Sequence, residues 1–452
     1  MRFSTREVSD AVHGVHRGPE VDLRGVSIDS RSVAPGDLFV PIVAARDGHD
    51  FIPVALAAGA AAHLTDRDHR IGDGDGADDG GGEVTAIEVA DTAAALTALG
   101  GHARGRLGDR VVGVTGSVGK TSLKDLLRAV GSTTWATWAN PGSFNNELGV
   151  PLTLCNAPDG TELTVVEMGA RGVGHIAELC ASARPTVGVV TVVAGAHLEQ
   201  FGSLDGVAAA KAELVRALPA SGAAVLNADD DRVAAMTRAT EAAVVTFGVR
   251  GGEVRAEGVV LDERLHPRFR LRSPWGSAPV TVGVAGRHQV TNALGAAACA
   301  LALGADVEAV AAGLAAGELS AHRMALVTAA GGARVLDDAY NANPTSMLAA
   351  LDALGELAAR RRVAVLGTMA ELGPDGDADH RGIAAAAAER GIELVTVAEA
   401  AYGLDGERAV ADVDAAVELV RSLDLDGRDA VLVKASRSAG LERVVAGLVA
   451  AG

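Results

Sequence analysis

The residues with the clearest chemical meaning form a glycine-bearing loop within VVGVTGSVGKTSLKDLL, at 111–127. Backbone N–H groups of such a loop, together with a helix N-terminus, can surround phosphate oxygens. Lys120 would reach the β- and γ-phosphates of a nucleotide, and the Thr121 hydroxyl would bind Mg²⁺. The pattern departs from G-x-x-x-x-G-K-[ST], because Val114 stands where the first glycine is expected. A glycine-rich turn with a surface lysine is the alternative, but the preceding strand and following amphipathic helix favour a nucleotide site.

Two further residues follow apolar runs that predict strands. Glu167 ends the run LTVVE, and His197 follows VGVVTVV by a few residues. Ligands of an open parallel sheet gather at the carboxyl ends of its strands, so we expect both residues near the phosphate loop. Glu167 is a suitable oxygen ligand for Mg²⁺, and His197 is a second metal or substrate-contacting candidate. Taken singly, a solvated strand-end acid and a loop histidine would explain them; together with the loop they indicate one site.

The elements that must position these residues fall into three blocks, predicted as domains over 1–107, 108–318 and 319–452. In the second block, β-branched runs alternate with alanine-rich helical stretches, as in a doubly wound, mostly parallel sheet. A polar stretch at 253–284 predicts antiparallel strands, and a helix is expected from about 290 to 303. The third block repeats the alternation. The predicted fold class is α/β, with a small N-terminal α/β domain, a central P-loop domain and a C-terminal Rossmann-like domain.

Two helices are predicted from apolar spacing. After the phosphate loop, four side chains share one helical face: Leu123, Leu126, Leu127 and Val130. In the third block, Pro344 suits a first helical turn. The apolar positions that follow it at helical spacing are Met347, Leu348, Leu351, Leu354 and Leu357.

Composition excludes several classes of protein. The 452 residues carry a net charge of −18, and a binder of nucleic acid or of anionic membranes normally presents a basic surface. The N-terminal MRFSTREVSD has no apolar core of a signal peptide. The longest apolar stretch, at 293–305, is too short to span a bilayer. The three cysteines, Cys155, Cys180 and Cys299, are far apart and indicate reduced core residues of a cytoplasmic protein.

Several stretches of the chain are distinctive beyond the phosphate loop itself. They are VSIDSRSVAPGDLFVPI, DGHDFI, TGSVGKTSLKDLL, NPGSFNNELGVPLTL, VVEMGA, AHLEQFGSLDGVAAAKAEL, AVLNADD, DDAYNANPTSM and VLGTMAELG. On these stretches the chain resembles the Mur ligase family over nearly its whole length. The phosphate loop is shared by all four ligases of that family and by folylpolyglutamate synthase, so FNNELGVPLTL and YNANP are the specific stretches. Within the family, the resemblance is strongest to the ligase that adds a dipeptide.

This resemblance implies an ATP-dependent ligase that joins D-alanyl-D-alanine to UDP-N-acetylmuramoyl-tripeptide through an acyl phosphate, in peptidoglycan synthesis. It also implies one domain each for the UDP moiety, ATP and the incoming amine. The implied nucleotide contacts are Thr115, Gly116, Ser117, Val118, Gly119, Lys120, Thr121, Ser122, Asn292, Arg323 and Asp338. The implied substrate contacts are Asp29, Ser30 and Arg31 for the UDP-sugar, Asn145 and Asn146 for the peptide, and Tyr340, Asn341 and Asn343 for D-alanyl-D-alanine.

Lys211, in AAKAEL, matches the lysine that the family carbamylates. The reaction of its amine with CO₂ gives an anionic oxygen ligand for a second Mg²⁺, and it requires a locally neutral amine. A solvated helix lysine is the alternative. The catalytic candidates are Lys120, His197 and Lys211, and the metal-ligand candidates are Thr121, Glu167, His197 and Lys211. Two Mg²⁺ ions, a monomeric state, no bound nucleic acid and no membrane insertion are expected.

The sequence departs from the family pattern at a few positions. Val118 replaces the usual asparagine of the phosphate loop, and Thr368 replaces an aspartate. His322 stands where the family has a glycine. Val192, Val193 and Ala194 replace Asn-Ile-Gly before His197. The departures keep an inactive homologue open as an alternative.

Other functions remain as alternatives. Another Mur-type or folylpolyglutamate-type amino-acid ligase is the nearest one, although the relative that adds diaminopimelate or lysine carries D-N-P-R where this chain has Y-N-A-N-P. A nucleotide-dependent switch is a second, since P-loop folds serve many functions. The chain lacks an NKxD-like guanine-reading motif, and its second Rossmann-like block suits a substrate better than an effector.

Overall fold

The computed structural model describes residues 1–67, 84–140, 142–195 and 201–450. His197 therefore lies outside the described residues. The chain forms two compact units. Unit 1 comprises Met1–Gly113, Trp135–Met168 and Ala177–Thr186, and unit 2 comprises Val114–Thr134, Gly169–Ile176 and Val187–Gly452.

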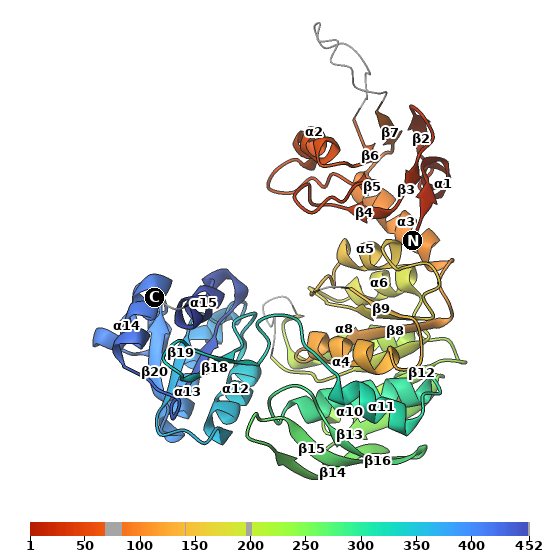
Figure 1. Ribbon diagram of the computed structural model, residues 1–452. Helices are drawn as coiled ribbons and strands as arrows, with labels where there is room; N and C mark the ends of the chain where they lie inside the picture. The colour runs from red at the N-terminus through yellow and green to blue at the C-terminus, as the bar shows by residue number, and fades with distance from the viewer. Residues whose placement is uncertain (68–83, 141, 196–200, 451–452) are drawn as a thin grey trace, which may run out of the picture. The chain divides into compact units, whose positions relative to one another are not determined.

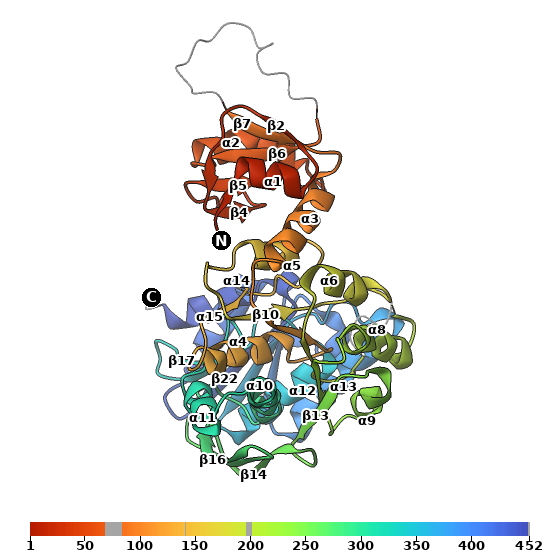
Figure 2. The same cartoon turned by 90° about the vertical axis from the view of Figure 1, so that its right-hand side faces the viewer.

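The N-terminal part of unit 1 is built on a five-stranded sheet of order β2-β7-β6-β5-β4, in which β4 to β7 run parallel and β2 is antiparallel. Helix α1 contacts β2, β7 and α3 (Figure 2). The strands are β2 (Val15–Arg17), β4 (Gly25–Ser27), β5 (Asp37–Phe39), β6 (Ala62–Thr65) and β7 (Thr85–Glu88), with a separate pair β1 (Phe3–Ser4) and β3 (Asp22–Leu23). The helices are α1 (Thr5–Ala11), η1 (Gly48–Phe51), α2 (Ile52–Ala57) and α3 (Thr92–Arg104).

A nine-stranded sheet follows in the chain, with the order β16-β15-β14-β13-β12-β11-β8-β10-β9. Strands β11 to β14 are parallel, and β14, β15 and β16 are antiparallel, as predicted for the polar stretch. The strands are β8 (Arg110–Thr115), β9 (Thr137–Ala139), β10 (Leu163–Glu167), β11 (Val187–Val190), β12 (Ala223–Asn227), β13 (Ala243–Gly248), β14 (Val254–Leu261), β15 (Pro267–Ser273) and β16 (Gly276–Thr281).

Helices α4 and α10 of unit 2 pack side by side, with α11 against α4 (Figures 1 and 2). The predicted apolar face of α4 is fully buried, and α10 matches the helix expected near 290–303. The helices associated with this sheet are α4 (Lys120–Gly131), α5 (Gly149–Cys155), α6 (His175–Ala183), α8 (Leu204–Arg216), α9 (Asp231–Ala234), η2 (Ala235–Ala239), α10 (Gln289–Ala302) and α11 (Val307–Ala315).

The C-terminal sheet of unit 2 has the order β17-β18-β22-β19-β20-β21, parallel except for β17. Its strands are β17 (Ala325–Thr328), β18 (Arg334–Asp337), β19 (Arg362–Leu366), β20 (Glu393–Val397), β21 (Ala409–Val410) and β22 (Ala430–Lys434). Its helices are α12 (Pro344–Glu356), η3 (Gly373–Asp375), α13 (Gly376–Glu389), η4 (Ala400–Tyr402), η5 (Gly406–Arg408), α14 (Val413–Ser422), η6 (Arg437–Ala439) and α15 (Glu442–Val449).

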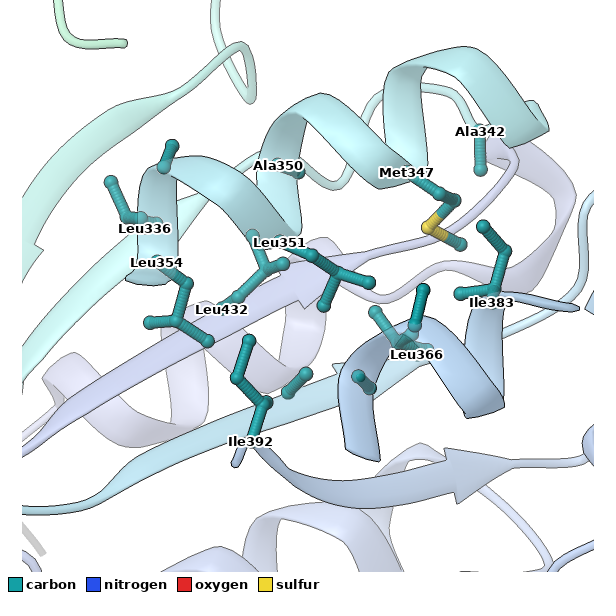
Figure 3. Close-up of a cluster of buried hydrophobic side chains, with 14 of the residues drawn as sticks. Leu336, Ala342, Met347, Ala350, Leu351, Leu354, Leu366, Ile383, Ile392 and Leu432 are labelled. Atoms are coloured by element: carbon teal, nitrogen blue, oxygen red, sulfur yellow. The ribbon is translucent and has the colours of Figure 1, made fainter. Parts of the chain in front are cut away.

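Aliphatic side chains fill the core beneath α12. Met347, Leu351 and Leu354 point from α12 towards Leu366 and Leu432 of the sheet (Figure 3), and all five are buried. Each such side chain contributes about 1.5–3 kcal/mol on burial. Leu348, which was expected on the same face, is instead 38% exposed. The predicted first-turn Pro344 is present.

The α/β fold class is confirmed by these sheets, and the three cysteines are buried, as expected. In the described part of the chain, no helix combines the length and apolar character that crossing a bilayer requires.

Candidate active site

The phosphate loop connects the end of β8, at Thr115, to the start of α4, at Lys120. Its two glycines have left-handed backbone angles, with φ of +148° at Gly116 and +86° at Gly119. A side chain at Gly119 would collide with Oδ1 of Asn292, and one at Gly116 would collide with Oγ1 of Thr191. Glycine is therefore required twice, because other residues rarely adopt this backbone and have no room for a Cβ atom.

Hydrogen bonds from the segment after β11 hold the loop. Ser117 donates its backbone N–H to Val192 O at 2.8 Å and its hydroxyl to Ala194 O at 2.9 Å. Thr191 Oγ1 donates to Val118 O at 2.6 Å. These bonds use the backbone carbonyls of Val118, Val192 and Ala194, so they do not depend on which side chains stand at these positions. Thr191 is a residue that the sequence analysis missed.

The side chains at the start of α4 lie as expected for a phosphate loop. Lys120 Nζ donates to Gly116 O at 2.7 Å, so the amine lies over the loop. Thr121 and Ser122 are buried at the first turn. Asn292, an expected nucleotide contact on α10, lies against Gly119 and donates to Gln289 Oε1 at 2.8 Å. The structure thus brings Lys120, Thr121 and Asn292 together in unit 2.

Lys211 belongs to the same group of residues. It lies in α8 and is only 5% exposed. Burial, and to a smaller extent the positive charge of Lys120, together lower the pKa of its amine from 10.5 to about 7. The alternative of a solvated helix lysine is wrong. An amine with this pKa is substantially neutral at pH 7, which is the form that can attack CO₂.

Glu167 and Asn145 are paired in unit 1. Asn145 Nδ2 donates to Glu167 Oε1 at 2.8 Å, and Glu167 is 1% exposed. The second carboxylate oxygen, Oε2, is buried with no hydrogen-bond partner. A buried carboxylate oxygen normally has a partner, and a bound cation supplies one. Asn146, the neighbour of Asn145, accepts a bond from Gly149 N at 2.9 Å and so supports the start of α5.

No cluster of three or more His, Cys, Asp or Glu side chains suitable for a metal occurs within residues 1–67, 84–140, 142–195 and 201–450. The predicted ligand set differs from such a cluster, since it uses a threonine hydroxyl and a modified lysine. The buried Oε2 of Glu167 fits an oxygen ligand of Mg²⁺, and the neutral amine of Lys211 is the form from which a carbamate oxygen ligand would be made.

In the loop after β4, Asp29 and Arg31 form an ion pair. Arg31 Nη2 donates to Asp29 Oδ2 at 2.6 Å, and this hydrogen bonding lowers the pKa of the Asp29 carboxyl to about 2. Ser30 lies between them and is half-buried. The arrangement presents an exposed guanidinium, with a side chain 85% accessible, beside a fixed carboxylate.

In the C-terminal part of unit 2, a buried lysine missed by the sequence analysis organises the predicted residues. Lys434, at the end of β22 and 2% exposed, donates to Asp338 Oδ2 at 2.5 Å and to Asn341 O at 2.7 Å. The signal was available in the run DAVLVK, which ends on a charged residue just as LTVVE does.

The remaining predicted residues lie near this lysine in the chain or in space. Arg323 places its guanidinium 4.2 Å from the centre of the Tyr340 ring, and Arg437, also missed, lies 5.8 Å from it. Asn343 caps α12 by accepting from Ser346 N at 2.9 Å. Its side chain therefore already has a structural role.

Three family descriptions match the chain: "Mur ligase family, catalytic domain" at 22–104, "Mur ligase middle domain" at 114–300 and "Mur ligase, glutamate ligase domain" at 322–445. A UDP-N-acetylmuramoyl-tripeptide–D-alanyl-D-alanine ligase of Mycobacterium bovis is 44% identical, over 94% of this chain and 92% of its own. The chain belongs to the Mur ligase family. The Escherichia coli K12 ligase of the same name is 35% identical, over 98% of this chain and 97% of its own.

Solved structures of Mur ligases agree with the fold. A crystal structure of MurF from Acinetobacter baumannii matches with a TM-score of 0.87 at 29% identity, covering 99% of both chains. MurF from Thermotoga maritima in complex with ADP matches with a TM-score of 0.76 at 26% identity, covering 94% of this chain and 97% of its own. The predicted family and the predicted three-domain α/β architecture are therefore confirmed.

Proposed function

We propose that this Mur ligase joins D-alanyl-D-alanine to UDP-N-acetylmuramoyl-tripeptide at the expense of ATP. The similarity to ligases of that name supports the substrates. The structural observation that supports this chemistry is the buried amine of Lys211. Its pKa is lowered by burial and by the positive charge of Lys120. A neutral lysine amine beside a phosphate loop could react with CO₂ and become an anionic oxygen ligand for the Mg²⁺ that phosphoryl transfer uses.

The reaction would proceed in two steps. The terminal carboxylate of the tripeptide attacks the γ-phosphate of ATP, and ADP leaves, so that an acyl phosphate forms. Lys120, the loop N–H groups and the N-terminus of α4 stabilise the charge on the transferred phosphoryl group. The neutral amine of D-alanyl-D-alanine then attacks the acyl carbon, and the tetrahedral intermediate releases phosphate.

Mg²⁺ would be held by Thr121, Glu167, His197 and carbamylated Lys211, and when bound it neutralises phosphate charge. Asn145 orients the Glu167 carboxylate through its 2.8 Å bond. The carbamylated Lys211 would supply an anionic oxygen ligand for Mg²⁺. Its formation requires the neutral amine, and the burial of Lys211 supplies that form near neutral pH.

The remaining assignments follow the proposed reaction. Asp29, Ser30 and Arg31 would bind the UDP-sugar, and Asn145 and Asn146 would bind the peptide. Asn292, Arg323 and Asp338 would contact the nucleotide, and Tyr340, Asn341 and Asn343 would bind the incoming dipeptide. We propose domains at 1–107, 108–318 and 319–452, a monomeric state and a cytoplasmic location.

The test is phosphate release from ATP by the purified protein with Mg²⁺, UDP-N-acetylmuramoyl-tripeptide and D-alanyl-D-alanine, with each component omitted in turn. Release should require both substrates, and a UDP-linked pentapeptide should appear by mass. Turnover with glutamate, a diamino acid or a folate but not with the dipeptide would overturn the substrate assignment. No turnover with any of them would favour an inactive homologue.

A further inference from the structure

The linker between α11 and β17 has an unusual backbone. His322 and Met324 have φ angles of +60° and +53°, in the left-handed region. Side chains other than glycine enter this region at an energetic cost, and they remain there only when surrounding contacts impose it. The two residues directly flank Arg323, so the contacts that hold them also determine where Arg323 lies.

Two adjacent carboxylates at the end of β18 hold these two residues. His322 Nδ1 donates to Asp337 Oδ2 at 2.8 Å, and Met324 N donates to Asp338 Oδ1 at 3.2 Å. Either the neutral Nδ1–H tautomer or the imidazolium form of His322 can make its bond. In addition, Tyr340 N donates to His322 O at 3.1 Å.

These bonds fix a turn of the linker at residues 322–324, and this turn places Arg323 against Tyr340. Because His322 is bonded both to Asp337 and to the backbone of Tyr340, the guanidinium of Arg323 is held 4.2 Å from the Tyr340 ring centre. A replacement by glycine makes clear what the His322 ring contributes. A glycine would adopt the same φ without strain, but it has no ring to bond Asp337.

We propose that His322 is a positioning residue of the ligase reaction: its imidazole, bonded to Asp337, fixes the turn that holds Arg323 against Tyr340. This inference rests on the proposed nucleotide role of Arg323 and the proposed dipeptide role of Tyr340. His322 itself would act through Arg323 and Tyr340 and would not touch either substrate.

The test compares His322→Gly, His322→Asn and His322→Ala in the full-length protein. His322→Gly keeps the backbone angle accessible, so its melting temperature should stay close to that of the parent. Loss of the Asp337 bond should raise KM for ATP and for D-alanyl-D-alanine, lowering kcat/KM by about 10- to 100-fold, with kcat less affected. His322→Asn tolerates the left-handed region and offers a side-chain donor, so it should recover part of the loss. His322→Ala should lose both stability and affinity.

Ala398→Gly is the matched control, because Ala398 is also left-handed, with φ of +53°, and is exposed. This control should leave all kinetic constants unchanged. KM values within twofold of the parent for a folded His322→Gly protein would overturn the proposal. ATP binding by calorimetry provides a separate readout: weaker binding by His322→Gly supports the positioning role even if the parent fails to ligate the dipeptide, whereas unchanged binding refutes it.

Discussion

Asn145 donates a 2.8 Å hydrogen bond to one oxygen of the Glu167 carboxylate, while the other oxygen is buried without a partner. The two residues are 22 positions apart in the chain. The bond fixes the plane of the carboxylate and so the direction of its second oxygen. An orienting partner of this kind affects metal binding although it does not touch the metal.

Asn145→Ala should therefore raise the Mg²⁺ concentration needed for half-maximal activity by about 10- to 100-fold. Glu167→Gln, which removes the anionic ligand, should raise it further. The measurement is a Mg²⁺ titration of phosphate release at saturating substrates. Ser182→Ala serves as the control, because its buried Oγ also lacks a partner but has no proposed role. An unchanged Mg²⁺ requirement in Asn145→Ala would contradict the orienting role.

Lys211 should make activity depend on CO₂. Removing CO₂ and bicarbonate from the buffer should lower the rate, and adding bicarbonate should restore it, while Lys211→Arg should respond to neither. Carbamylation should be slower below about pH 7, where the amine of pKa about 7 is protonated. A ¹³C signal from labelled bicarbonate, absent in Lys211→Arg, would identify the carbamate. Equal rates with and without bicarbonate would count against it.

The lowered pKa of Lys211 should also make the free energy of unfolding depend on pH. The Lys211 amine has a pKa of about 7 in the folded protein against an ordinary 10.5. Between these values the unfolded chain binds the additional proton, so the free energy of unfolding should rise with pH over this window. Lys211→Met should remove that part of the slope. Urea unfolding at pH 7 and pH 9, without Mg²⁺ or CO₂, measures the difference, and parallel pH dependences for the two proteins would disprove it.

Gly119→Ala should lower kcat/KM for ATP by about 100-fold or more. The reason is that φ is +86° there and a Cβ atom would collide with Asn292. Gly101→Ala, in α3, is the control, because its Cβ would meet no atom within 4 Å. That control should leave the kinetics unchanged and add about 0.5–1 kcal/mol of stability. Similar kinetics for the two variants would show that the loop tolerates the methyl group.

Lys434→Met should destabilise the protein by about 3 kcal/mol, because it leaves the Asp338 carboxylate without its buried partner. Adding Asp338→Asn should cost less than the sum of the single changes. Urea unfolding of the four proteins gives the coupling. Arg443→Met breaks the exposed Arg443–Asp414 pair and should cost less than about 1 kcal/mol. If the losses in the free energy of unfolding from Lys434→Met and Asp338→Asn are additive, the two side chains do not stabilise the fold by a direct interaction.

Substitutions of Asn343 can separate its capping of α12 from its proposed contact with D-alanyl-D-alanine. Asn343→Ala should lower stability by about 1 kcal/mol through loss of the α12 cap. Asn343→Ser keeps a capping hydroxyl, so its melting temperature should be nearly that of the parent, while KM for D-alanyl-D-alanine should rise. If KM is unchanged in Asn343→Ser, capping is the whole role of this side chain.

The sequence alone determined the phosphate loop, the strand and helix alternation and the family. Each depends on near neighbours in the chain: the spacing of glycines around Lys120, and the apolar periodicity of helices such as α4 and α12. Leu348 shows where prediction from helical spacing fails. The spacing predicts it on the buried face of α12, but its side chain is 38% exposed. Which part of an apolar stripe is covered depends on the elements packed against it.

Only the tertiary structure decided the chemical state of the site residues. Lys211 has a lowered pKa because distant segments bury it, and Lys434 meets Asp338 across 96 positions of chain. For Asn343 the family resemblance implies a substrate contact, and the structure adds that its side chain caps a helix. Desolvation and long-range hydrogen bonds arise from the packing of the whole fold, and no local pattern records them.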